Sequence, residues 1–213
     1  MRFHTLLDFL FPRRSLGGSE GESITEEERR HLGGSRIVED RTELQKRGIF
    51  FLDRLVAASA FAESPLLRKA IHTFKYGRVR SLADELSELM VRAAPSTVLT
   101  HPVLCPVPLH WSRLFSRGFN QSALLAHVIA QRRGLRYQSL LRRIRPTGTQ
   151  TKRNRAQRLT ALIGAFRCCE PSLPSFVILI DDLSTTGATM DACAKELKKC
   201  GVARVEGWVI AHG

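Results

Sequence analysis

The sequence predicts an α/β fold with a mostly parallel, Rossmann-like sheet flanked by helices. Residues 176–180 are large or β-branched apolar side chains, a pattern typical of a strand that is buried on both faces. Residues 190–199 have helical apolar spacing and are followed by Gly201 as a predicted C-cap, and residues 205–210 form a second strand pattern. A strand–helix–strand series of this length is a βαβ unit, in which the two strands run parallel.

The other main elements are predicted from the same kind of spacing. Apolar residues at helical period predict helices over 65–76, 81–93 and 119–133, and Asn120 is a candidate N-cap for the last one. Residues 98–107 form a strand pattern, and the two prolines near its end interrupt the hydrogen-bond ladder.

The length and composition indicate one domain of usual size with an appendage. The chain has 213 residues, of which 43% are hydrophobic and 25% charged, as in globular proteins. Residues 13–48 combine glycines and an acidic run with little periodicity, which predicts a loose arm or linker. We therefore divide the chain into an N-terminal helix with a flexible arm (1–48) and a main domain (49–213).

Composition also bears on the compartment. The longest apolar runs are far shorter than the ~20 residues that span a bilayer, so we expect no membrane insertion. The opening run contains Asp8 and no small-residue cleavage site, which is atypical of a signal peptide, and we expect a cytoplasmic protein. The five cysteines include no Cys-x-x-Cys pair, so we expect reduced, mostly buried thiols without redox or metal duty.

The most informative segment is 177–189, Val-Ile-Leu-Ile-Asp-Asp-Leu-Ser-Thr-Thr-Gly-Ala-Thr. A strand pattern ends there, and a turn of small residues opens a helix. Small side chains let backbone N–H groups approach an anion closely, and the helix adds the positive end of its dipole. We therefore expect a phosphate site formed by Thr185, Thr186, Gly187, Ala188 and Thr189.

Two carboxylates, Asp181 and Asp182, stand beside this turn. They repel phosphate, but they suit the vicinal hydroxyls of a ribose, which donate hydrogen bonds, or a bound magnesium ion. The alternative is an ordinary turn in which Asp182 or Thr185 only caps the helix.

The segment resembles the 5-phosphoribosyl-1-pyrophosphate (PRPP) signature of type I phosphoribosyltransferases: two acidic residues, two variable positions and Thr-Thr-Gly-Ala-Thr. The resemblance implies a type I phosphoribosyltransferase fold, with Asp181 and Asp182 as catalytic residues and residues 185–189 holding the 5-phosphate. It also implies Mg²⁺ as a cofactor that arrives with PRPP, without a metal site made by the protein alone.

Residues 105–122, which begin with Cys-Pro-Val-Pro and contain Arg-Gly-Phe-Asn-Gln, resemble the narrower ComF/GntX group of phosphoribosyltransferase-like proteins, as does Phe-Lys-Tyr-Gly at 74–77. By this resemblance, 105–122 is the loop that faces pyrophosphate. Arg113 and Arg117 offer forked donors for phosphate oxygens, so we expect them to bind the pyrophosphate.

Residues 145–158 resemble the same group and form a polar, basic run. In phosphoribosyltransferases a flexible loop at this position closes over PRPP, and the resemblance assigns Thr149, Gln150 and Arg155 to it. Many relatives begin with cysteine pairs that look like a zinc ribbon. This chain has Ser15 and Gly18 at the positions of two such cysteines, so we expect a degenerate remnant without zinc and a helix over 6–11.

The net charge of +13 is unevenly distributed, because no carboxylate occurs between Glu88 and Glu170. Such a basic interval attracts pyrophosphate, nucleotides or a nucleic-acid backbone, and composition does not choose among these ligands.

Two functions are therefore considered. The first is transfer of the phosphoribosyl group of Mg-PRPP to an unknown acceptor, with release of pyrophosphate. The second is a non-catalytic module of the same fold that acts in DNA uptake during natural competence or in nucleic-acid binding. Partner hypotheses are PRPP, single-stranded DNA or the competence machinery, and a second copy in a homodimer.

Overall fold

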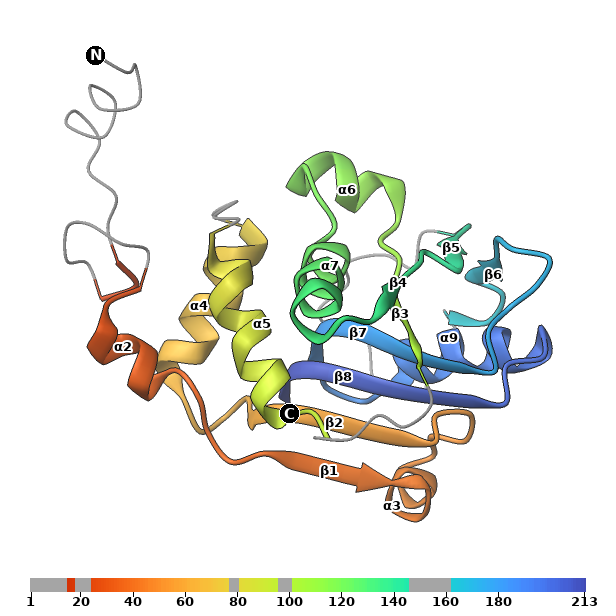
Figure 1. The fold of residues 1–213 in the computed structure, drawn as a ribbon, viewed down its shortest axis with the longest axis horizontal. Coiled ribbons are helices and arrows are strands. Elements are labelled where there is room, and N and C mark those ends of the chain that lie inside the picture. Colours follow the sequence, from red (N-terminus) through yellow and green to blue (C-terminus); the bar gives the residue numbers. More distant parts are fainter. Residues whose placement is uncertain (1–14, 18–23, 77–80, 96–100, 146–161) are drawn as a thin grey trace.

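The computed structural model describes residues 15–17, 24–76, 81–95, 101–145 and 162–213. At its centre lies a six-stranded sheet of order β1-β2-β8-β7-β3-β4 (Figure 1). The strands are β1 (Ile37–Asp40), β2 (Arg54–Ala60), β3 (Val103–Pro106), β4 (Arg136–Tyr137), β7 (Phe176–Ser184) and β8 (Arg204–His212). Only β1 is antiparallel to its neighbour. The predicted α/β class with a mostly parallel sheet is confirmed, and the fold is compatible with that of type I phosphoribosyltransferases.

Both faces of the sheet are covered. One face packs against α4 (Pro65–Tyr76), α5 (Leu82–Ala93) and α7 (Gln121–Arg133). The other face packs against α3 (Arg41–Lys46), α9 (Ala188–Lys199) and a small antiparallel sheet of β5 (Leu141–Arg143) and β6 (Phe166–Cys168). Because side chains alternate along a strand, Ile178 faces the first layer and Leu179 the second. This two-sided burial explains the continuous apolar run of β7.

The chain leaves β3 and β7 toward opposite faces. After β3 it passes through α6 (Trp111–Arg117) to α7 on the first face, whereas after β7 it enters α9 on the second. The carboxyl ends of these neighbouring strands thus form the topological switch point, where open α/β folds bind ligands. Pairing with β3 stops at Ile180, while pairing with β8 continues to Ser184. From Asp181 onward, β7 is therefore open on its β3 side.

Several predicted elements agree closely with the structure. α4 coincides with the predicted helix 65–76, and Asn120 caps α7 by accepting a 3.1 Å hydrogen bond from the Ser122 amide. α9 starts at Ala188, two residues earlier than predicted, and its C-cap is Cys200, one residue before the predicted one. Strand β7 runs beyond the predicted 176–180, so both acids lie within the strand rather than after it.

The loose arm predicted for 13–48 differs from the structure over residues 24–48. There, α2 (Glu26–His31) and α3 begin with capping boxes at Thr25 and Asp40, and β1 adds an edge strand to the main sheet. Both boxes follow the Ser/Thr/Asp-x-x-Glu pattern, which the glycine content obscured. The predicted helix 6–11 lies outside the described residues, and the domain boundary at 48/49 stays a prediction.

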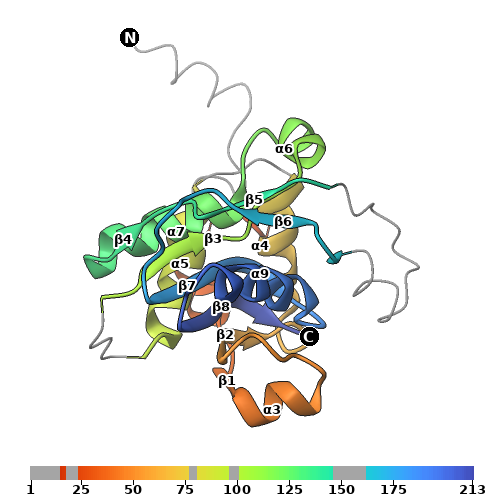
Figure 2. The ribbon, with the colours of Figure 1, turned by 90° about the vertical axis from the view of Figure 1, so that its right-hand side faces the viewer.

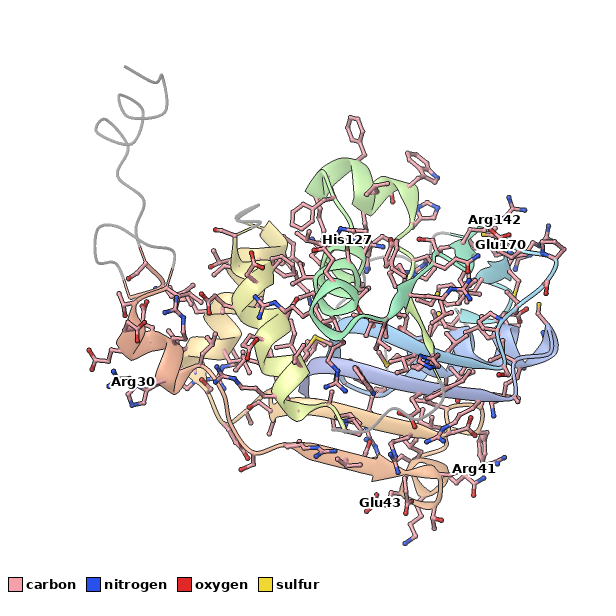
Figure 3. The ribbon with its side chains drawn as sticks, in the orientation of Figure 1. Arg30, Arg41, Glu43, His127, Arg142 and Glu170 are labelled. Atoms are coloured by element: carbon pink, nitrogen blue, oxygen red, sulfur yellow. The ribbon has the colours of Figure 1, made fainter. Side chains whose placement is uncertain are left out.

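Three peripheral elements frame the sheet. Figure 3 shows Arg30 of α2 and Arg142 of β5 at opposite ends of the longest axis. Helix α6 projects from the body of the fold in both ribbon views (Figure 1 and Figure 2).

Among the helices of the described ranges, none has the length and apolar character that crossing a bilayer requires.

Asp191, in the first turn of α9, connects this helix to the segment before β2. One of its carboxylate oxygens accepts hydrogen bonds from the amides of Phe50, Phe51 and Leu52, at 3.1, 2.6 and 3.1 Å. The side chain is buried. A single carboxylate thus holds three consecutive amides against the start of α9.

We expect Asp191→Ala to lower the free energy of unfolding by about 1–3 kcal/mol, because the three amides lose their acceptor. Urea denaturation followed by circular dichroism measures this change. Asp84→Ala is the matched control, because the Asp84 side chain is 66% exposed, and surface changes typically stay within about 0.5 kcal/mol. Equal losses for the two variants would contradict the role given to Asp191.

Candidate functional site

The turn between β7 and α9 forms a small cavity at the switch point. The cavity is lined by Asp181, Leu183, Ser184, Thr185, Thr186, Gly187, Ala188, Thr189 and Met190. Its volume of about 50 Å³ is several times the about 10–15 Å³ that one water needs. All five residues predicted to hold a 5-phosphate, 185–189, therefore line one cavity, and we call them the Thr-rich turn. Their role as a phosphate site stays a prediction.

Backbone amides of the Thr-rich turn are available to a ligand. The first hydrogen bond of α9 runs from the Asp191 amide to the Gly187 carbonyl. Among the residues that the structure describes, none accepts a hydrogen bond from the amides of Thr186, Gly187 or Thr189. The Ala188 amide has one long contact, of 3.4 Å, to Thr186 Oγ1. Unsatisfied amides at the positive end of a helix dipole favour an anion.

Gly187 meets two separate constraints. Its φ of 76° lies in the left-handed region, which favours glycine, and a Cβ atom there would lie 3.1 Å from Ile49 Cδ1. Ile49 is buried and directly precedes the three amides that Asp191 holds. The Thr-rich turn therefore rests on a fixed part of the core.

A polar network supports the other side of the turn. Arg47 Nη2 donates to the Thr185 carbonyl at 3.0 Å, and Arg47 Nη1 donates to Glu39 at 2.5 Å. His212 Nδ1 lies 2.7 Å from the Ser184 carbonyl, and its Nε2 lies 2.6 Å from Arg47 Nη1. Because a carbonyl only accepts, Nδ1 carries the proton and Nε2 accepts from Arg47. Neither Arg47 nor His212 was predicted, since no local pattern connects them to the turn.

The two acids have different surroundings. Asp181 is partly exposed and lines the cavity, where its Oδ1 accepts hydrogen bonds from Ser122 Oγ at 2.8 Å and from the Asp182 amide at 2.9 Å. Asp182 is buried, and its Oδ1 lies 2.8 Å from Lys75 Nζ. Strand alternation turns the two side chains to opposite faces of β7. Asp181 is thus the acid that a ligand in the cavity meets.

The environment of Asp181 favours its neutral form. Although the residue is partly exposed, the protein atoms around its carboxyl desolvate it. This desolvation, followed by the charge of Asp182, raises the pKa of Asp181 to about 7, although the Ser122 hydrogen bond and the Lys75 charge act in the opposite direction. A carboxyl that changes its charge near neutral pH beside a cavity is typical of functional sites.

The two ComF-like motifs meet next to these acids. The Gln121 side chain donates to the Lys75 carbonyl at 3.4 Å and accepts from Arg117 Nη1 at 3.2 Å. Arg117 also lies over the Tyr76 ring, 5.1 Å from its centroid. Residues 74–76 and 117–122, far apart in sequence, therefore form one wall of the switch point. The sequence contained both motifs, but it did not indicate the contacts Lys75–Asp182 and Ser122–Asp181.

The two arginines predicted for pyrophosphate, both on α6, have different neighbours. Arg117 is held by Tyr76 and Gln121, whereas Arg113 has Arg143 of β5 as an electrostatic neighbour. Burial and then the Arg113 charge lower the pKa of Arg143, while Asp181 raises it. Arg143 is thus an additional cation near the site that the predictions did not include. The predicted loop residues, Thr149, Gln150 and Arg155, lie outside the described residues.

The donors at this site suit a magnesium ion that is bound together with phosphates. Within the described ranges no group of three or more His, Cys, Asp or Glu side chains is arranged to hold a metal. One partly exposed carboxylate, Asp181, lies at the cavity, and Asp182 is engaged by Lys75. Mg²⁺ is usually bound through one or two carboxylates, with water and substrate phosphates completing its shell. These residues fit that mode, in which Asp181 would be the carboxylate available to the ion, and magnesium binding stays a prediction.

Comparison with known proteins finds relatives that are named for DNA utilization or for competence. No family model matches the chain. DNA utilization protein YhgH of Salmonella typhimurium is 34% identical over 165 residues, which cover 75% of this chain and 72% of the relative. Competence protein F of Haemophilus influenzae is 28% identical over 170 residues, 75% and 73% of the two chains. Competence protein ComFC of Streptococcus pneumoniae is 32% identical over 100 residues, 47% and 43% of the two chains.

The raised pKa of Asp181 predicts a pH dependence of stability. Between the unfolded pKa of about 4 and the folded pKa, the folded state binds more protons, so this carboxyl makes stability fall as pH rises. We expect Asp181→Asn to remove this pH-dependent loss. The free energy of unfolding of the variant minus that of the wild type should therefore be larger at pH 8 than at pH 5. Urea unfolding at both pH values measures the difference, which is at most about 1.4 kcal/mol per pH unit.

Glu88→Gln is the control of opposite sign. The hydrogen bond from Arg92, opposed by burial, lowers the pKa of Glu88. The ionised Glu88 side chain therefore stabilises the fold above its unfolded pKa, and this stabilisation is lost as pH falls through the folded pKa. We thus expect Glu88→Gln not to be more stable than the wild type at pH 8. A pH profile of Asp181→Asn that parallels the wild type would refute the assignment.

Proposed function

Since the chain belongs to the ComF family, we propose that it is a phosphoribosyltransferase-like protein that binds PRPP with Mg²⁺ and serves a process related to DNA uptake. The chemistry we propose is transfer of the phosphoribosyl group of PRPP to an acceptor. One observation carries the proposal: the amides of Thr186, Gly187 and Thr189, which make no hydrogen bond to any residue that the structure describes, line a cavity together with Asp181. A sugar phosphate combines an anion with vicinal hydroxyls, and this cavity offers donors for the first and a carboxylate for the second.

In the proposed reaction, the bond between ribose C1 and a pyrophosphate oxygen breaks, and an acceptor atom bonds to C1. Pyrophosphate leaves with the electron pair, so positive charge develops on the ribose and negative charge on the leaving group. Asp181 accepts hydrogen bonds from the ribose hydroxyls and stabilises the positive charge. Arg113, and Arg143 beside it, neutralise the leaving group. When bound with PRPP, Mg²⁺ supplies further neutralisation of the pyrophosphate oxygens.

Lys75 and Ser122 have positioning roles in this proposal. Lys75 neutralises Asp182, which keeps the total charge of the acid pair low enough for an anionic substrate. Ser122 fixes the carboxylate of Asp181 from the first turn of α7. Both are therefore expected to act through the acids rather than on PRPP directly.

The relatives named for DNA utilization and competence support a role in DNA uptake, and α6 offers a surface for single-stranded DNA. Trp111 is 72% and Phe115 88% exposed on this helix, which also carries Arg113 and Arg117. Exposed aromatic rings stack on bases without sequence preference, and arginines attract the phosphates. We propose nucleic-acid binding at α6 as the second function, whether or not transfer occurs.

We expect saturable binding of PRPP in isothermal titration calorimetry with Mg²⁺, and loss of that binding in the double variant Asp181→Asn with Asp182→Asn. Gly187→Ala is expected to weaken binding by about 10- to 100-fold, because a Cβ atom displaces the amides that hold the phosphate.

Gly201→Ala is the matched control for Gly187→Ala. Both glycines have positive φ, 94° and 76°, but nothing lies within 4 Å of a Cβ built on Gly201, at the far end of α9. Both substitutions strain the backbone, and only the one at Gly187 is expected to affect PRPP. Absence of heat at millimolar PRPP in a folded wild-type protein would contradict PRPP binding.

For the second function, we expect a fluorescein-labelled oligothymidine to bind with an affinity that falls steeply with salt. The double variant Trp111→Ala with Phe115→Ala should weaken binding at least about tenfold, since stacking contributes about 1–3 kcal/mol per base. Fluorescence anisotropy at several salt concentrations measures both effects. Phe50→Ala removes an aromatic ring that is 58% exposed elsewhere and serves as control. Unchanged affinity in the double variant would refute binding at α6.

A further inference from the structure

The cysteines are distributed differently from the expectation of mostly buried, inactive thiols. Cys105 and Cys193 are buried, but Cys168 is half-buried, and Cys169 and Cys200 are exposed. Cys168 ends β6 in the small sheet, and Cys200 is the C-cap of α9. These two residues belong to elements that pack against each other on the same face of the main sheet.

Both cysteines bond to one carbonyl group. The Cys168 thiol donates to the Glu196 carbonyl, with 3.5 Å between Sγ and O, and the Cys200 amide donates to the same oxygen at 3.2 Å. The Cys200 side chain is also an electrostatic neighbour of the Cys168 thiol. The end of α9 therefore brings together two sulfur atoms that are distant in sequence.

We propose that Cys168 and Cys200 are a modification site, a thiol pair that oxidation by a hydroperoxide closes to a disulfide. The Cys200 thiolate attacks the peroxide oxygen and becomes a sulfenic acid, with release of water or an alcohol. Cys168 sulfur then attacks the Cys200 sulfur, its proton leaves with the displaced hydroxide as water, and the S–S bond forms. Two thiols are oxidised and one peroxide is reduced, so the electrons balance.

Exposure assigns the order of these steps. Cys200 is exposed and meets the oxidant first, whereas Cys168 is half-buried and resolves the intermediate. Burial, together with the neighbouring Cys200, raises the pKa of Cys168 to about 12. Because the thiolate is the attacking species, closure is slow, and the pair responds to sustained rather than brief oxidation.

The cross-link would act on the position of the small sheet. Cys168 is paired with Leu141 of β5, and β5 also contains Arg143, the cation with Asp181 and Arg113 as electrostatic neighbours. A bond from β6 to the end of α9 fixes this sheet relative to the helix whose first turn belongs to the Thr-rich turn. The pair itself does not depend on the proposed function, and the test below needs no substrate.

In the test, the reduced protein is treated with hydrogen peroxide, its remaining free thiols are blocked, and its tryptic peptides are identified by mass spectrometry. Trypsin cuts after Arg167, Lys195, Lys199 and Arg204, so Cys200 remains on the peptide 200–204 and Cys168 on 168–195. We expect these peptides to be joined and two of the five thiols to be lost. The thermal midpoint should rise by roughly 5–10 °C, because the cross-link restricts the unfolded chain.

Three variants distinguish the sulfur atoms. Cys168→Ser and Cys200→Ser should abolish the joined peptides, whereas Cys169→Ser should keep them, since its side chain alternates to the other face of the strand. Cys200 is exposed, so its variant is expected to fold. Joined peptides in Cys168→Ser, or oxidation of wild-type Cys200 to sulfinic acid without a cross-link, would overturn the proposal.

Discussion

Hydrogen bonding along β7 changes at Ile180, and the candidate site depends on this change. Up to Ile180 the strand is paired on both sides, whereas from Asp181 to Ser184 only β8 continues the ladder. The open edge admits Ser122 from α7 to Asp181, and the connections after β3 and β7 depart to opposite faces. A cavity with main-chain donors and one accessible acid follows from this topology.

The site combines rigid support with unfavourable electrostatics. Arg47 donates to the Thr185 carbonyl, Ile49 packs against Gly187, and Asp191 fixes the amides that follow Ile49. The amides of the Thr-rich turn therefore need little reorganisation to meet an anion. The acid pair, in contrast, places two carboxylates on consecutive residues, and the direct ion pair of Lys75 is with Asp182. The protein thus retains Asp181, whose negative charge is disfavoured by its surroundings, at the place where a ligand is expected. Such electrostatically unfavourable groups are common in functional sites.

Local patterns predicted much of the fold, and long-range contacts explain what they missed. The βαβ unit, α4 and the cap at Asn120 follow from apolar period and capping chemistry. The capping boxes at Thr25 and Asp40 were also present in the sequence, although the glycines around them suggested a loose arm. The contact between Ser122 and Asp181 spans 59 residues and depends on how far β3 extends, which no local pattern contains. The same holds for His212 and Arg47 behind the turn.

The edges of the main sheet limit how copies of this protein associate. β1 has four residues, with Glu39 and Asp40 at its end, and β4 on the opposite edge has two residues. Short, charged edges are poor templates for an added strand. Aggregation by strand addition is therefore disfavoured, and a homodimer would have to be built on helical or loop surfaces instead of a continuous intermolecular sheet.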